Sequence, residues 1–195
     1  MKKLSLIFLL FLTSCASTSI ISSTNPDFEI PKLKKILVIA SCGDLGERIQ
    51  AENIFAKELD RLELEGVPYL SIFSPDEHYG AKEAKVLLDK NEIDGTLVII
   101  RTDEFNTHKY LEPEYFNLAV MSGWNDMSYQ PMMKGANFAK EVSKYKISLL
   151  NRKRKRIWTA DTTTEGRKQS AVYKSIAKSV VKNLIKDGIT TEQKK

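Results

Sequence analysis

The sequence predicts an α/β fold, in which a βαβαβ unit with three parallel strands precedes an antiparallel hairpin and a C-terminal helix. Residues 36–40 and 96–100 are uninterrupted apolar runs, which are typical of strands buried on both faces of a sheet. Residues 144–150 alternate between apolar and polar side chains, as in a strand with one solvated face. Apolar residues recur at helical spacing over 169–186. Right-handed crossovers would place the three parallel strands in the spatial order 2-1-3.

The first fifteen residues resemble the signal peptide of a bacterial lipoprotein. Two lysines are followed by an apolar run over 4–12 that is too short to span a bilayer. Residues 12–15 read Leu-Thr-Ser-Cys and resemble the lipobox, an apolar residue and two small residues before a cysteine. We therefore expect cleavage between Ser14 and Cys15, with a diacylglyceryl group on the Cys15 thiol. The alternative is an ordinary signal peptide with a chance cysteine.

This resemblance implies a location and a division of the chain. Two or three acyl chains on Cys15 would anchor the protein stably, at about 0.8 kcal/mol per buried methylene. The residue that follows is Ala16 and not aspartate, which by family analogy favours the outer membrane, facing the periplasm. We expect a signal peptide over 1–14, the acylated cysteine and a flexible tether over 15–32, a periplasmic domain over 33–188, and a polar tail over 189–195.

The net charge bears on the class of partner, and the cysteine count bears on how the fold is stabilised. The formal net charge of +5 falls to +3 once Lys2 and Lys3 leave with the signal peptide, and this small excess does not indicate nucleic-acid binding. With Cys15 acylated, only Cys42 remains, so no intramolecular disulfide can form. The fold must therefore be stabilised by its hydrophobic core alone.

The amino-terminal half is predicted as follows. Residues 16–31 are rich in Ser and Thr and contain two prolines without a helical or alternating pattern, so we expect an extended tether. After the strand at 36–40, Asp44 would cap a helix that runs to about Glu65 and ends at Gly66. The apolar stripe of this helix comprises Ile49, Phe55, Ala56, Leu59 and Leu62.

The remaining elements alternate until a long irregular segment interrupts them. A second strand is expected at 67–73, a second helix at 81–91, and the third strand follows Asp94-Gly95. Residues 105–135 show no sustained period. The hairpin has its turn at 151–155, and the final helix ends at Asp187-Gly188.

The sequence contains none of the common catalytic signatures. It has no Walker A loop, no HExxH, no GxSxG and no paired CxxC motif. His78 and His108 have no companion ligand at metal-binding spacing. We therefore predict no metal site, no cofactor and no catalytic residues.

Polar residues follow the three predicted parallel strands, where ligands bind in open α/β sheets. Cys42 and Asp44 follow the first strand, and Asp103 and Glu104 follow the third. Cys42 would lie near a helix N-terminus, which can lower a thiol pKa. These four residues are the candidate ligand pocket, or the site of a thiol-dependent enzyme. The alternative is a set of capped and solvated loops.

Five consecutive basic residues occupy 152–156, in the predicted hairpin turn. Such a tip could contact anionic lipid headgroups, lipopolysaccharide phosphates or an acidic partner. The alternative is a turn kept soluble by charge, whose basic residues also protect a sheet edge.

The order of elements resembles the superfamily of bacterial lipoproteins with the TolB amino-terminal-like fold, of the LpoB and CsgG type. The resemblance rests on the lipobox, the strand at 36–40, the strand entry at 94–99, the hairpin over 145–158 and the helix end at 184–188. The hairpin turn lacks the glycine common in this group. The resemblance implies a binding or assembly factor and no enzymatic activity.

Together these observations predict a non-catalytic outer-membrane lipoprotein, acting as a periplasmic accessory or activator through contacts with another envelope protein. Aromatic residues and methionine are enriched at interface cores, so the candidate partner-binding residues are Tyr115, Phe116, Trp124 and Tyr129. These residues could instead cover the sheet. The alternatives are a subunit of a secretion or export assembly, which would form homo-oligomers, and a small-ligand binder at the strand ends.

Overall fold

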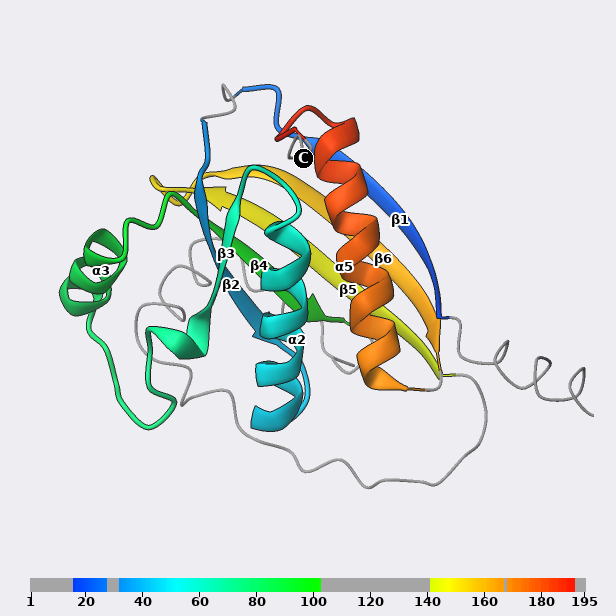
Figure 1. Ribbon diagram of the computed structural model, residues 1–195, viewed down its shortest axis with the longest axis horizontal. Helices are drawn as coiled ribbons and strands as arrows, with labels where there is room; N and C mark the ends of the chain where they lie inside the picture. The colour runs from blue at the N-terminus through cyan, green and yellow to red at the C-terminus, as the bar shows by residue number, and fades with distance from the viewer. Residues whose placement is uncertain (1–15, 28–31, 103–140, 167, 192–195) are drawn as a thin grey trace, which may run out of the picture.

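The computed structural model describes residues 16–27, 32–102, 141–166 and 168–191 (Figure 1). Six strands, three α-helices and a short 3₁₀ helix lie within these ranges. In chain order they are β1 (Ser17–Thr24), β2 (Lys35–Ser41), α2 (Leu45–Leu59), β3 (Glu65–Pro68), η2 (Tyr69–Ser71), α3 (Ala81–Lys90), β4 (Gly95–Arg101), β5 (Glu141–Asn151), β6 (Arg156–Gly166) and α5 (Gln169–Lys186).

All six strands form one mixed sheet in the order β1-β6-β5-β4-β2-β3. β2 pairs with β3 and β4 in parallel, whereas β5 pairs antiparallel with both β4 and β6. The three parallel strands therefore lie in the predicted order, with the first of them in the middle. The predicted α/β fold class, with its antiparallel hairpin and C-terminal helix, is confirmed.

The larger hydrophobic core lies between one face of the sheet and the adjacent helices α2 and α5 (Figure 1). Alternate residues of β2, among them Val38 and Ala40, face this core. Its largest fully buried side chains are Trp158, Tyr145, Tyr173 and Phe55. On α5, Val172, Ile176, Val180 and Leu184 face this core at intervals of four residues, which is the spacing that predicted the helix.

A smaller core lies on the opposite face, beneath η2 and α3. Leu37 and Ile39 of β2 point into it, together with Ala84 of α3. Tyr69 and Phe73 stack with their ring centroids 4.6 Å apart. Ala84 is the only fully buried residue of α3, so few contacts hold this helix against the sheet.

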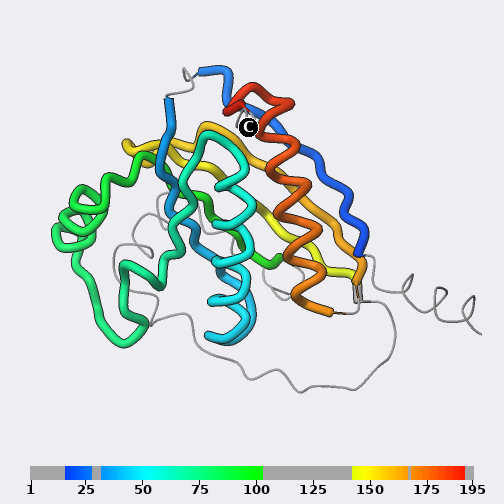
Figure 2. The backbone as a smooth tube through the Cα atoms, in the orientation of Figure 1, coloured from blue at the N-terminus to red at the C-terminus, as the bar shows by residue number. Residues whose placement is uncertain are grey.

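The tether expected over 15–32 is wrong for residues 17–24, which form the edge strand β1 beside β6 (Figure 2). Thr18, Ile20 and Ser22 are half-buried and alternate with exposed neighbours. The Thr18 hydroxyl donates to Ser175 Oγ at 2.8 Å, which joins the strand to α5. The Ser22 hydroxyl donates to Asp187 Oδ2 at 2.6 Å, and the Trp158 indole donates to the same oxygen at 2.7 Å.

The segment after α2 also differs from the prediction. α2 ends at Leu59 and not near 65, and Gly66 belongs to β3. A Cβ at Gly66 would collide with the backbone of Ala56, so this glycine permits close approach of the strand to the helix. β3 ends at Pro68, where η2 replaces the second half of the predicted strand.

Two single residues lie elsewhere than predicted. Ile49 was assigned to the apolar stripe of α2, but its side chain is 43% exposed. Ile189 was assigned to the polar tail, but it is buried in the larger core.

The hairpin turn forms as predicted between β5 and β6. The Arg154 amide donates to the Asn151 carbonyl at 2.8 Å, and the Lys155 amide donates to Asn151 Oδ1 at 3.0 Å. Arg154 adopts a left-handed backbone with φ of 60°, the conformation that glycine would supply more easily. Within the described ranges, no helix has both the length and the apolar character needed to cross a membrane.

Candidate functional site

The structure describes two of the four residues predicted to share a pocket at the carboxyl ends of the strands, Cys42 and Asp44. Cys42 follows β2 and is buried in the larger core, with 5% of its surface exposed. Asp44 caps α2, because its Oδ1 accepts from the Glu47 amide at 2.9 Å. Asp103 and Glu104 lie outside the described residues. Cys42 and Asp44 therefore have different structural roles, and the predicted helix cap is confirmed.

Two buried tyrosines lie close to Cys42. Gln169 donates to the hydroxyls of Tyr145 and Tyr173 at 3.1 and 2.9 Å. Burial raises the pKa of Tyr145 to about 12, against the lowering effect of the nearby Arg101 charge. Burial, followed by the nearby Cys42, also raises the pKa of Tyr173. Both phenols therefore stay neutral at physiological pH and form a hydrogen-bonded core cluster.

The burial of Cys42 bears on the predicted thiol chemistry. A reactive thiol needs access to solvent and an electropositive environment that stabilises the thiolate. Cys42 is enclosed by aromatic and aliphatic side chains of the larger core. Its surroundings favour a packing role.

Glu52 is a functional candidate that the sequence reasoning did not identify. It is completely buried on α2, where its Oε1 accepts from the Ala40 amide at 3.3 Å and its Oε2 accepts from the Leu70 amide at 3.1 Å. One carboxyl group thus joins α2, the end of β2 and η2. Burial raises the pKa of Glu52 to about 7, and the two backbone donors and Arg48 oppose this shift only in part.

A sequence signal for Glu52 was present. Counting from Glu52, the buried residues Phe55, Ala56 and Leu59 follow at positions i+3, i+4 and i+7. A carboxylate in that register lies on the apolar face of the helix and needs buried hydrogen-bond donors.

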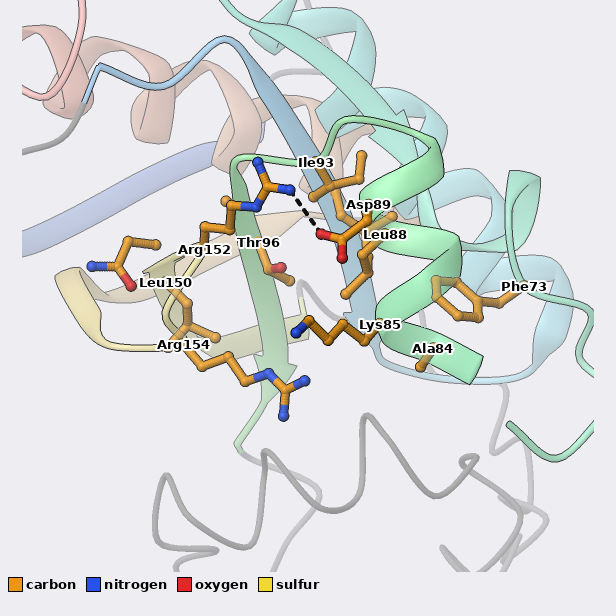
Figure 3. A pocket seen from close by; sticks show the side chains of 13 residues that line it. Phe73, Ala84, Lys85, Leu88, Asp89, Ile93, Thr96, Leu150, Arg152 and Arg154 are labelled. Atoms are coloured by element: carbon orange, nitrogen blue, oxygen red, sulfur yellow. Dashed lines mark hydrogen bonds and ion pairs between the residues drawn. The ribbon is translucent and has the colours of Figure 1, made fainter. Parts of the chain in front are cut away.

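A pocket of about 130 Å³ lies at the other end of the parallel strands (Figure 3). Its walls come from α3, from the first residues of β4 and from the hairpin turn. Gly95 and Thr96 begin β4, and Leu150 and Asn151 end β5, so the pocket lies near the amino ends of the parallel strands. This is the opposite end from the one predicted.

Charged residues surround the mouth of this pocket. Arg152 Nη2 lies 2.7 Å from Asp89 Oδ1, which joins the hairpin turn to α3. This carboxylate raises the pKa of Arg152. Lys85 and Arg154 also line the pocket, and neither has a carboxylate partner within the described part of the chain. The lining residues therefore carry two positive charges that are not balanced locally.

This position decides one alternative for the basic run at 152–156. The outer strands of the sheet are β1 and β3, and the hairpin strands β5 and β6 both lie inside it. The run does not protect a sheet edge, so that part of the alternative is wrong. The sequence identified the basic residues of the turn but not Lys85, because only the fold brings α3 beside the turn.

The other predicted site residues remain predictions. Ser14, Cys15, Tyr115, Phe116, Trp124 and Tyr129 lie outside the described residues. Across the ranges that the structure describes, no three His, Cys, Asp or Glu side chains form a group able to hold a metal ion.

No protein-family model matches the sequence, and no curated protein matches it. Among solved structures, the chain is similar to the PelC dodecamer from Paraburkholderia phytofirmans, with a TM-score of 0.49 and 14% identity, covering 90% of this chain and 99% of that chain. A dodecameric methionine-for-leucine variant of the same PelC gives a TM-score of 0.49 and 12% identity, covering 89% and 99% of the two chains.

Proposed function

We propose that this chain is a lipid-anchored protein of the bacterial outer membrane that faces the periplasm and acts without catalysis, as an accessory or assembly factor for another envelope protein. The observation that carries the proposal is the position of β1, which begins at Ser17, two residues after the lipobox Cys15. An acyl anchor on Cys15 would therefore be joined almost directly to the sheet.

Ala16, which lies between Cys15 and β1 in sequence, is itself hydrogen-bonded to the domain. The Ser175 hydroxyl of α5 donates to the Ala16 carbonyl at 3.1 Å. Ala16 also lies beside Gly166 at the end of β6. An acylated Cys15 would hold the domain close to the bilayer by this end. The anchor would then set the orientation of the domain, and a long flexible linker would not be the source of its effective concentration.

The hairpin turn lies at the opposite end of the sheet from Ser17 (Figure 1). β6 has 11 residues between the turn and the anchored end, which corresponds to about 35 Å of extended chain. Electrostatic attraction to anionic headgroups decays over a Debye length of about 8 Å in physiological salt. With the anchor on Cys15, the basic turn would therefore be directed toward the periplasm and away from its own membrane.

The accessory role rests on the predicted interface. Tyr115, Phe116, Trp124 and Tyr129 belong to the segment that connects β4 to β5, and both strands reach that connection at the anchored end. A partner in or near the same membrane would meet this end of the domain first. The alternative partner is a second copy of the chain, as in a secretion or export assembly.

Fatty-acid labelling in cells tests the anchor. We expect the wild-type chain and the Cys42→Ser control to incorporate label, and the Cys15→Ser variant to lose it. Label that persists in Cys15→Ser would refute the anchor.

Photocrosslinking from position 124 tests the accessory role separately. We expect one dominant envelope protein in the membrane fraction, with Lys153 on the turn as the control position. Crosslinks only between copies of the chain would favour the export-assembly alternative. A folded, acylated protein that forms no crosslinks from position 124 would contradict the accessory role.

A further inference from the structure

The floor of the pocket beside the hairpin turn is apolar. Leu37, Phe73, Leu88, Ile93 and Leu150 line it. The pocket as a whole, its charged rim included, has a volume of about 130 Å³, which is close to the ~150 Å³ of a cavity that holds one benzene molecule. The floor can therefore accept one ring-sized apolar group, and it is too small for a long acyl chain.

The packing of α3 leaves this apolar surface available. Ala84 is the only residue of the helix that is fully buried, whereas Leu88 is half-buried above the pocket. Apolar atoms that line an open pocket of this size are in contact with water. An apolar group inserted between α3 and β4 would remove that surface from water, which is favourable.

The rim carries two cations that no carboxylate within the described ranges neutralises. Figure 3 shows the Lys85 side chain extending from α3 and the Arg154 side chain extending from the turn, on opposite sides of the opening. Arg152 is engaged with Asp89 and closes a third side. Thr96, half-buried on β4, points its hydroxyl into the space between them.

The backbone at Arg154 provides an independent observation. Its φ of 60° is a conformation that glycine adopts without strain and that other residues adopt at a cost. A strained residue next to a pocket supports a role for its side chain. Here that side chain is one of the two uncompensated cations at the rim.

We propose that this pocket binds a phosphate monoester that carries one ring-sized apolar group. The ring occupies the space between α3 and β4, and the phosphate lies between Lys85 and Arg154, within reach of Thr96. A phosphate monoester carries between one and two negative charges at neutral pH, which matches the two uncompensated cations better than a carboxylate does. This site does not depend on the lipid anchor or on the proposed accessory role.

Phenyl phosphate is the probe, titrated into the purified full chain in non-ionic detergent and followed by calorimetry and by amide chemical shifts. We expect saturable binding with shifts at Thr96 and along α3. Inorganic phosphate tests the contribution of the ring, and benzoate tests the contribution of the second charge. Each should bind at least about tenfold more weakly than phenyl phosphate.

Three variants separate the site from general attraction to a basic turn. Lys85→Ala and Arg154→Gly should each weaken binding at least about tenfold, and the glycine suits the backbone at that position. Lys153→Ala is the matched control, because it removes one charge from the same turn without lining the pocket. It should change binding by less than about twofold, since an exposed charge outside the site is screened.

Several results would overturn the proposal. If inorganic phosphate binds as tightly as phenyl phosphate, the apolar floor does not contribute to binding. If benzoate binds as tightly as phenyl phosphate, the site does not select a phosphate. Equal losses in Lys153→Ala and Arg154→Gly would reduce the site to a charged turn. Vesicles containing phosphatidylglycerol are the last comparison, and binding to them without binding to phenyl phosphate would identify a lipid-contacting surface instead.

Discussion

Replacing Glu52 with glutamine should remove a pH dependence from the stability of the fold. The folded chain retains the Glu52 proton up to a pKa of about 7, whereas an unfolded chain releases it near 4.5. Between these two values the folded state binds more protons than the unfolded state. The contribution of Glu52 to the free energy of unfolding should therefore be highest below pH 4.5, fall as the pH rises, and level off above pH 7.

The size of this effect follows from the two pKa values. The interval from 4.5 to about 7 corresponds to about 3 kcal/mol of unfolding free energy. The cause is the cost of burying a carboxylate that two amide donors, from Ala40 and Leu70, compensate only in part. Glutamine at position 52 is neutral at every pH and retains one of the two acceptors, so the loss of the other lowers the stability by an amount that does not depend on pH.

Urea unfolding of wild type and Glu52→Gln from pH 4.5 to 8 measures this difference. We expect the stability of the variant, relative to wild type, to increase by about 3 kcal/mol across that interval. Glu63→Gln is the control, because Glu63 is exposed, and it should keep the wild-type slope. If Glu52→Gln has the same pH profile as wild type, Glu52 is not the group that titrates and the reasoning from its burial fails.

Three further substitutions test other features of the fold by urea unfolding. Arg154→Gly should raise the unfolding free energy by about 1 kcal/mol, because glycine relieves the left-handed backbone, and a loss of stability would contradict that account. Asp187→Ala should lower it by about 2–3 kcal/mol, because the Ser22 and Trp158 donors lose their common acceptor, and a neutral result would mean that β1 is held by other contacts. Gly66→Ala should lower it by about 2 kcal/mol through collision with the backbone of Ala56, whereas unchanged stability would show that β3 can move away from α2.

The parallel part of the sheet could be predicted because its signal is local. Strands buried on both faces must be apolar throughout, and the runs at 36–40 and 96–100 satisfy that condition without reference to the rest of the chain. The C-terminal helix could also be predicted, because its apolar residues recur at helical spacing. Gly188 marks its end, and this glycine adopts the left-handed backbone with φ of 74° just after the helix.

β1 could not be predicted from the sequence because its stabilising contacts come from distant parts of the chain. Ser and Thr dominate the strand, and the hydroxyls of Thr18 and Ser22 bond to α5 and to Asp187, which are about 160 residues away in sequence. Its half-buried positions are Thr, Ile and Ser, so apolar periodicity could not distinguish this strand from a soluble linker. The role of Gly66 could not be predicted for the same reason, because it depends on contact with the backbone of Ala56 and not on the residues next to Gly66 in sequence.

The pocket illustrates how the fold joins residues that have separate meanings in sequence. The basic turn alone allowed either contact with an anion or a turn kept soluble by charge, and residues 81–91 alone predicted only a helix. The Arg152–Asp89 ion pair brings them together, and Lys85 then faces Arg154 across an apolar floor.

The proposed anchor and the proposed pocket lie at opposite ends of the same strands. β1 begins two residues after Cys15 and runs antiparallel to β6, so an anchored domain whose strands stand perpendicular to the bilayer would present the hairpin turn about 35 Å from the bilayer surface. At that distance the headgroups of its own membrane cannot satisfy Lys85 and Arg154, because the attraction is screened within about 8 Å. Any anion that these residues bind must then come from the periplasm, from a partner or from an opposing surface. The short connection between Cys15 and β1 would therefore limit the pocket to ligands away from its own membrane.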